Sequence, residues 1–228
     1  MAEVIFKNSG KTIKVENVYC IGKNYIDHIK ELDSPSVKSE IPQEPVIFLK
    51  PNSSVCTGAR EISMPEFKGK KISSDLQNEV ELVIIIGKDG KNIPLENAYS
   101  FVEGYAVGID FTLRDIQSDF KKKGLPWTLS KGFLGSAPLS AASTADDVGV
   151  PNKLNIKLTI NGITKQEANT SQMIFKVGYI IHYISSIFGL KRGDIIFTGT
   201  PAGVTRLNAG DVIKAEIEKI GKLEIKVL

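Results

Sequence analysis

Apolar and polar residues alternate with a period of two over much of this chain, which is the pattern of strands with one buried face. Short runs of this kind lie on both sides of the turn residues Asn8-Ser9-Gly10. The segment "KLNIKLTINGITKQEA" has Asn161-Gly162 at its centre, and this pair is a strong signal for a tight hairpin turn. The pattern therefore predicts a strand-rich chain. The expected strands lie at 3–22, 45–51, 79–86, 100–110, 153–168, 193–204 and 210–228, whereas 52–74 is expected to be irregular and polar.

Three segments have helical spacing instead. A short helix is predicted within 24–33, a second within 111–124 before Gly124, and the longest within 171–190. In the longest, the apolar residues expected to face a core are Ile174, Val177, Ile180, Ile181, Ile184 and Ile187. Residues 34–45 contain three prolines and few large apolar side chains, so a mobile loop is expected there.

The chain shows no repeat, no low-complexity tract and no linker. Its 228 residues are 42% hydrophobic, which is enough to bury a substantial core. We therefore expect one β-rich α+β domain over 1–228, in which 1–17 form a short N-terminal strand extension.

Charge and cysteine content exclude several classes of protein. The net charge is only +3 and positive residues are interspersed with acidic ones, so no nucleic-acid partner is expected. Lys121, Lys122 and Lys123 are interpreted as a solvated helix end. Cys20 and Cys56 lack the spacing of a zinc site or a disulfide scaffold. No segment resembles a membrane span or a signal peptide, so a cytoplasmic setting without membrane contact is expected.

Two glutamates interrupt an otherwise apolar strand. Glu79 and Glu81 point to one face about 6 to 7 Å apart, where their repulsion is about 2.5 kcal/mol at an effective dielectric constant of about 20. Either this strand end is solvated, or the carboxylates share a divalent cation such as Mg²⁺. The second interpretation requires a further acid, and Asp110 at the end of the strand 100–110 is available.

Seven segments together resemble the fumarylacetoacetate hydrolase family, in particular its short acylpyruvate hydrolase and oxaloacetate decarboxylase branch. They are "GKNYIDHIKE", "PVIFLKP", "NEVELVIIIG", "GYAVGIDFTLRDIQ", "KKKGLPWTLSKGF", "QEANTSQMIF" and "GDIIFTGTPAGV". The resemblance runs from about Val18 to about Val212. It implies the family's mixed β-sandwich roll and a homodimer.

The resemblance also implies a role for individual residues. Metal ligands map to Glu79, Glu81 and Asp110, with Mg²⁺ as the cofactor and Mn²⁺ or Ca²⁺ as possible substitutes. A base that activates water maps to His28, oriented by Glu31, and Lys131 maps to the lysine at the substrate. The positions that map to substrate-binding residues are Lys23, Asn24, Arg114, Gln117 and Thr200. Many relatives have arginine where this chain has Lys23, so the far end of the substrate can differ here.

The implied activity is metal-dependent cleavage of a carbon-carbon bond in a small 2-oxo acid. Two reactions fit, the hydrolysis of acylpyruvates and the decarboxylation of oxaloacetate, and both pass through a metal-bound pyruvate enolate. Isomerisation or tautomerisation of a 2-oxo acid remains a second enzymatic interpretation. A non-catalytic metal- or ligand-binding protein is less well supported, because such a protein would have little physical reason to keep His28, Glu31, Lys131 and three acids together.

Overall fold

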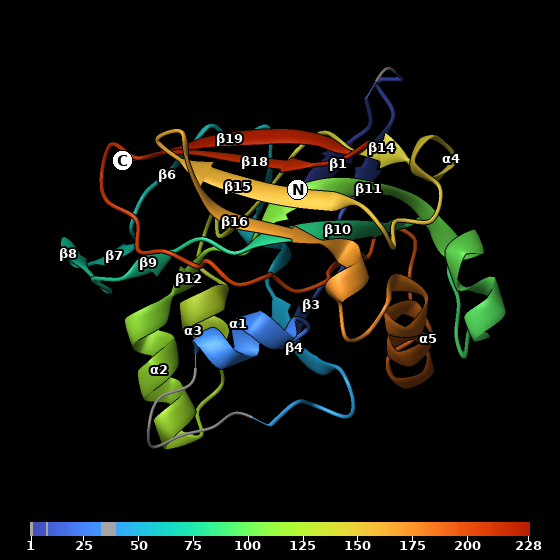
Figure 1. Ribbon diagram of the computed structural model, residues 1–228, viewed down its shortest axis with the longest axis horizontal. Coiled ribbons are helices and arrows are strands. Elements are labelled where there is room, and N and C mark those ends of the chain that lie inside the picture. Colours follow the sequence, from blue (N-terminus) through green and yellow to red (C-terminus); the bar gives the residue numbers. More distant parts are fainter. Residues whose placement is uncertain (1, 8, 33–39) are drawn as a thin grey trace.

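The structure is a computed structural model that describes residues 2–7, 9–32 and 40–228. Two sheets form its frame (Figure 1). The eight-stranded mixed sheet contains, in spatial order, β4 (Val46–Lys50), β3 (Val18–Gly22), β17 (Ile195–Phe197), β10 (Val80–Ile86), β11 (Val102–Ile109), β13 (Ala137–Leu139) and β5 (Val55–Thr57), with β14 (Ser143–Thr144) paired to β11. The five-stranded sheet contains β16 (Ile163–Asn169), β15 (Asn155–Ile160), β18 (Val212–Ile217), β19 (Gly221–Val227) and β6 (Glu61–Ile62).

Smaller elements complete the chain. The two-stranded ribbons pair β1 (Glu3–Ile5) with β2 (Thr12–Lys14), β9 (Leu76–Gln77) with β12 (Thr112–Leu113), and β7 (Glu66–Phe67) with β8 (Lys70–Lys71). The α-helices are α1 (Ile26–Glu31), α2 (Arg114–Lys123), α3 (Thr128–Lys131), α4 (Ala145–Val148) and α5 (Val177–Ile187). The 3₁₀-helices are η1 (Asn52–Ser54), η2 (Leu95–Phe101) and η3 (Thr170–Gln172).

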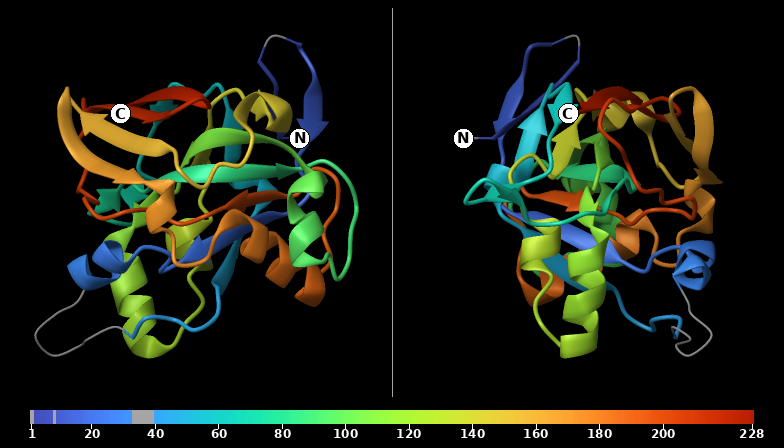
Figure 2. Two further views of the ribbon diagram at one scale, coloured as in Figure 1. Left: turned by 45° about the vertical axis from the view of Figure 1, so that its right-hand side comes forward. Right: turned by 90° about the vertical axis from the view of Figure 1, so that its left-hand side faces the viewer.

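Strand β10 lies at the centre of the molecule and is buried on both faces. Leu82, Ile84 and Ile86 belong to the core between the two sheets, whereas Val83 and Ile85 belong to a second core. The N-terminal hairpin β1–β2 also contributes to this second core, around which the eight-stranded sheet curls. Figure 2 shows the five-stranded sheet as a separate layer and the N-terminal hairpin at the opposite edge. Burial on both faces explains why residues 82–86 of β10 are a continuous run of branched apolar residues.

The hairpin predicted within 153–168 agrees with the structure. The hairpin β15–β16 turns at Asn161 and Gly162, whose φ angles of 51° and 81° are those of a tight two-residue turn. The described part of the chain contains no helix that is both long and apolar enough to cross a bilayer.

Other sequence predictions agree with the structure only in part. Helix α2 begins only at Arg114, because Thr112 and Leu113 pair with β9. Ile187 was expected to face a core but is 55% exposed at the end of α5. Residues 52–74 are not irregular throughout, since β5 to β8 lie there. Of the expected loop at 34–45, residues 34–39 lie outside the described residues, and 40–45 contain no helix or strand.

The helices α1, α2 and α3 gather on one side of the molecule, below β10 and β12 in Figure 1. They come from separate parts of the sequence, and each contributes side chains to the same pocket. This convergence positions the candidate site.

Candidate active site

Three carboxylates meet where β10 begins and β11 ends. Glu79 and Glu81 lie on the same face of the strand as Val83, as the alternation predicted. The backbone N–H of Asp110 donates to the Glu79 carbonyl oxygen over 2.8 Å, so these two residues lie opposite each other on neighbouring antiparallel strands. One oxygen from each of the three carboxylates lies within 4.8 Å of the others. The exposed fractions are 5% for Glu79, 2% for Glu81 and 0% for Asp110, so the interpretation as a solvated strand end was wrong.

Two cations compensate the negative charge of Glu79. Lys131 Nζ donates to Glu79 Oε2 over 2.6 Å and to Asp110 Oδ2 over 2.7 Å, and Arg114 forms an ion pair with Glu79 Oε1. Burial alone would raise the pKa of Glu79, but Lys131 and Arg114 outweigh burial and lower the pKa. Burial likewise opposes the charge on Lys131, whose pKa is nevertheless raised by Asp110 and Glu79.

Among the described residues, no cationic side chain forms an ion pair with Glu81. Burial, followed by the charges of Asp110 and Glu79, raises its pKa well above the ordinary value. Its Oε2 accepts a hydrogen bond from the backbone N–H of Gly199 over 2.6 Å. A side chain at Gly199 would collide with Asn24, because a Cβ atom there would lie 2.7 Å from the Asn24 Cβ. The glycine therefore allows the backbone to approach Glu81 closely.

The three carboxylates fit a divalent cation. Asp110 Oδ1 is buried and accepts no hydrogen bond from the described residues. The Lys50 ammonium group lies 2.7 Å from this oxygen, but it donates to the carbonyl oxygens of Lys131 and Ser136 instead. A buried carboxylate oxygen without a hydrogen bond is a ligand that a hard cation such as Mg²⁺, Mn²⁺ or Ca²⁺ can use.

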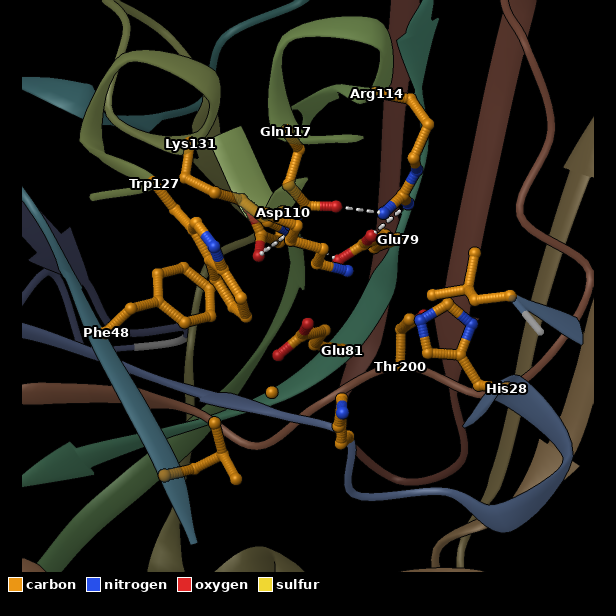
Figure 3. A pocket seen from close by; sticks show the side chains of 15 residues that line it. His28, Phe48, Glu79, Glu81, Asp110, Arg114, Gln117, Trp127, Lys131 and Thr200 are labelled. Carbon is orange, nitrogen blue, oxygen red and sulfur yellow. Dashed lines mark hydrogen bonds and ion pairs between the residues drawn. The ribbon is translucent and has the colours of Figure 1, made fainter. Parts of the chain in front are cut away.

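Helix α1 brings His28 to the pocket from the opposite side. Figure 3 shows His28 across the pocket from Phe48 and Trp127, with Glu81 between them. His28 Nδ1 lies 3.2 Å from Glu31 Oε2, and Glu31 Oε1 accepts from the Gly203 backbone N–H over 2.9 Å. Burial would raise the pKa of Glu31, but the bonds to His28 and Gly203 outweigh burial and lower the pKa. The structure thus brings together the expected pair and fastens it to the loop after β17.

Four of the five predicted substrate-binding residues line the pocket. Lys23, Gln117 and Thr200 line the pocket, as does Arg114. Arg114, however, donates to Gln77 Oε1, Gln117 Oε1 and Glu79, so it mainly holds Glu79 in place.

The prediction that Asn24 binds substrate is not supported by its position. Its side chain is fully buried and donates to the carbonyl oxygens of Phe175 and Thr198 over 3.0 and 2.7 Å. Its Oδ1 accepts from the Phe175 N–H over 2.7 Å. All these bonds join parts of the scaffold, and Asn24 is not among the residues that line the pocket.

Several residues at the site were not predicted, among them Phe48, Trp127, Lys50 and Lys121. Phe48 and Trp127 form one wall, with ring centroids 5.6 Å apart, and Lys50 supports Asp110 from behind. A lysine that ends an apolar strand, as in "PVIFLKP", was the available signal for Lys50.

Lys121 was interpreted as part of a solvated helix end, and it is exposed, but it also lines the pocket. Its Nζ lies 5.1 Å from the Trp127 ring centroid. Desolvation by the surrounding protein, followed by the charge of Arg114, lowers the pKa of Lys121 to about 8. The sequence spacing alone could not distinguish it from Lys122 and Lys123.

Comparison with known proteins places this site in a family. Residues 17–228 match the fumarylacetoacetate (FAA) hydrolase C-terminal family. The chain is 42% identical over 212 residues to oxaloacetate tautomerase FAHD1, mitochondrial, of Mus musculus, a match that covers 93% of this chain and 91% of that protein. It is 44% identical over 203 residues to oxaloacetate decarboxylase, mitochondrial, of Dictyostelium discoideum, with 88% of each chain covered.

A solved structure agrees with these matches. Fumarylpyruvate hydrolase from Pseudomonas aeruginosa, crystallised in complex with Mn²⁺ and pyruvate, superposes with a TM-score of 0.92 at 35% identity, covering 100% of this chain and 95% of that chain. The expected strand-rich mixed roll is therefore confirmed. Since the family match covers nearly the whole chain and the relatives are enzymes, this protein is an enzyme that belongs to the fumarylacetoacetate hydrolase family.

Proposed function

We propose that this protein is a divalent-metal-dependent enzyme that cleaves a carbon-carbon bond in small 2-oxo acids. Its reaction would be the hydrolysis of acylpyruvates, the decarboxylation of oxaloacetate, or both. The observation that carries the proposal is the convergence of three buried carboxylates, Lys131 and the His28–Glu31 pair on one pocket. The names of the mouse, Dictyostelium and Pseudomonas relatives support the same substrate class.

Glu79, Glu81 and Asp110 would hold the cation. When bound there, a divalent cation supplies a Lewis acid that polarises the 2-oxo group and stabilises the negative charge of an enolate. Mg²⁺ is our preferred cation, and the Mn²⁺ in the Pseudomonas structure supports a divalent ion in general. Arg114 keeps Glu79 ionised, and Lys50 holds the Asp110 side chain in place.

His28 is the proposed base. Glu31 accepts from Nδ1 and so favours the tautomer whose Nε2 is free to take a proton. In hydrolysis this proton comes from the water that attacks the carbonyl group distal to the 2-oxo acid. The Lys131 ammonium group then steadies the oxyanion that develops. Phe48 and Trp127 form an apolar wall that excludes bulk water from the reacting groups.

Decarboxylation needs no attacking water. The bond to the departing carboxylate breaks, CO₂ leaves, and its electron pair forms an enolate whose oxygen the Lys131 ammonium group would stabilise. His28 is then less important. Tautomerisation of a 2-oxo acid is a second candidate, which the name of the mouse relative favours. It also passes through the enol and would use His28 to move a proton.

A substrate panel tests the proposal. Purified protein with Mg²⁺ or Mn²⁺ is given acetylpyruvate, fumarylpyruvate and oxaloacetate, and carboxylic acid, pyruvate, CO₂ and the enol are followed separately. We expect His28→Ala to abolish hydrolysis while decarboxylation suffers less. If the metal-loaded protein turned over none of these acids, the proposed function would be wrong.

The homodimer and the cytoplasmic location expected from the sequence are also proposals. The family resemblance supports a homodimer, which light scattering of the purified protein tests directly. A cytoplasmic location stays a prediction from the sequence, and the mouse relative is named as mitochondrial.

A further inference from the structure

Gln166 on strand β16 joins the two sheets, because it bonds Val80 of β10 and also Thr200, which lines the pocket. Gln166 is fully buried. Its Oε1 accepts from Asn78 Nδ2 over 2.9 Å and from the Val80 N–H over 3.1 Å, and its Nε2 donates to Thr200 Oγ1 and to the Pro201 carbonyl oxygen, each over 2.8 Å. Four hydrogen bonds use the whole capacity of the amide. Gln166 thus ties the start of the glutamate strand to the loop that follows β17.

The orientation of this amide follows from its backbone partners. A backbone N–H can only donate, so the atom that faces Val80 must be the oxygen. A carbonyl oxygen can only accept, so the atom that faces Pro201 must be the nitrogen. The assignment of Oε1 and Nε2 therefore follows from chemistry and needs no further assumption.

This orientation determines what the Thr200 hydroxyl can do. Thr200 Oγ1 must accept the hydrogen bond from Gln166, and it lies 2.9 Å from the Val80 carbonyl oxygen, which can only accept. The single hydroxyl proton is therefore directed to Val80. With that proton used, the Thr200 hydroxyl has none to donate to a carboxylate in the pocket.

The backbone N–H groups of the same loop have different partners from the Thr200 hydroxyl. The N–H of Gly199 donates to Glu81 Oε2, so the loop and the carboxylate cluster are in direct contact. Among the hydrogen bonds of the described residues, none is donated by the N–H of Thr200, although Thr200 is buried and lines the pocket. A ligand in the pocket can therefore supply the acceptor that this N–H lacks among the described residues.

We propose that Gln166 is a positioning residue that holds the Thr200 hydroxyl in the scaffold, so that the backbone N–H of Thr200 meets the carboxylate of a bound 2-oxo acid. This inference rests on the proposed function. It replaces the expectation that the Thr200 side chain itself binds substrate. Gln166 then acts on the ligand only through Thr200.

A double-mutant cycle tests the inference by ligand binding. The variants are Gln166→Met, Thr200→Val and the double variant, and the probe is oxalate in the presence of Mg²⁺. Binding is followed by the fluorescence of Trp127, which is the sole tryptophan and lines the pocket. We expect each single change to weaken oxalate binding about tenfold, since each frees Thr200 from the scaffold and lets its backbone N–H move away from the ligand. The double change should be no worse than the stronger single one.

Three further variants keep the test informative. Thr200→Ser retains the hydroxyl and both of its bonds, so it should bind oxalate like the wild type. Gln166→Leu lacks the amide altogether, so it should behave like Gln166→Met, and it replaces that variant if the latter does not fold. Thr170→Val is the matched control, because the buried Thr170 hydroxyl bonds Leu154 and Pro151 away from the pocket. It should lower thermal stability and leave oxalate affinity unchanged.

Additive losses in the double variant would overturn the inference, because they would mean that the Thr200 hydroxyl contacts the ligand independently of Gln166. Oxalate affinity that is normal in Gln166→Met and lost in Thr200→Val would overturn it as well. A different result would contradict the proposed function alone: wild-type protein that binds oxalate but converts no 2-oxo acid.

Discussion

Lys50 Nζ lies 2.7 Å from Asp110 Oδ1, and both side chains are closed off from solvent. Lys50 also donates to Ser136 Oγ over 3.0 Å and to backbone carbonyl oxygens around α3. A buried ion pair of this kind is costly to break, because removing one partner leaves the other charge uncompensated. Lys50 therefore links the stability of the fold to the geometry of the carboxylate cluster.

Lys50→Met should lower the free energy of unfolding by about 3 to 5 kcal/mol. Chemical denaturation of the metal-free protein measures the change. Lys123→Met is the control, because Lys123 and Asp119 form an exposed pair at 2.8 Å and its loss should cost less than about 1 kcal/mol. Equal losses of unfolding free energy in the two variants would show that the buried ion pair contributes no more to stability than the exposed one.

Glu81→Gln should weaken Mg²⁺ binding at least about tenfold, because it removes a charged oxygen ligand. The pKa of Glu81 is raised in the folded protein, so a cation must displace its proton. The apparent Mg²⁺ affinity of the wild type should therefore rise with pH above the ordinary glutamate value of about 4.3 and level off beyond the raised pKa. Isothermal titration calorimetry at several pH values checks both points. A wild-type affinity that is flat over this range would contradict the assignment of Glu81 as a ligand.

Lys131→Met should lower turnover by about 10² to 10³, because it removes a charge directed at the developing oxyanion. Mg²⁺ binding should be unchanged or tighter, since Lys131 competes with the cation for oxygens of Glu79 and Asp110. Calorimetry and steady-state kinetics on one preparation separate these effects. Weaker Mg²⁺ binding with normal turnover of the loaded enzyme would reverse the proposed role.

Lys121→Gln should raise KM for oxaloacetate, which has two carboxylates, more than KM for acetylpyruvate, which has one. The pKa of Lys121 is about 8, so above that pH the ammonium group loses its charge and KM of the wild type for oxaloacetate should rise. Lys122→Gln is the matched control, as the neighbouring lysine does not line the pocket. Identical KM shifts in both variants would indicate only a general charge effect.

Helix α1 is proposed to act as a lid. It has six residues, too few to be stable alone, and the hydrogen bond from the Gly203 N–H to Glu31 holds it over the pocket. Hydrogen exchange should show stronger protection of the amides in 24–32 when oxalate and Mg²⁺ are present than when they are absent. Glu31→Gln should reduce this gain, whereas Asp27→Asn, an exposed change on the same helix, should not. Equal protection with and without oxalate would show that no ligand-driven closure occurs.

The sequence by itself determined the local features of this protein. The two-residue period placed Glu79 and Glu81 on one face of a strand, and Asn161-Gly162 placed a hairpin turn, because each follows from neighbouring residues. The order of seven motifs indicated the family and, through it, His28, Glu31 and Lys131.

Only the tertiary structure decided how distant residues act on one another. Register placed Asp110 opposite Glu79, burial excluded a solvated strand end, and the packing of α2 brought Lys121 to the pocket while Lys122 stayed outside. Asn24 and Thr200 lie in motifs of the family, yet their polar side-chain groups are used by the scaffold. A motif specifies which residue is present, whereas its hydrogen-bond partners come from remote strands and loops, and these partners decide whether a polar group is free to meet a ligand.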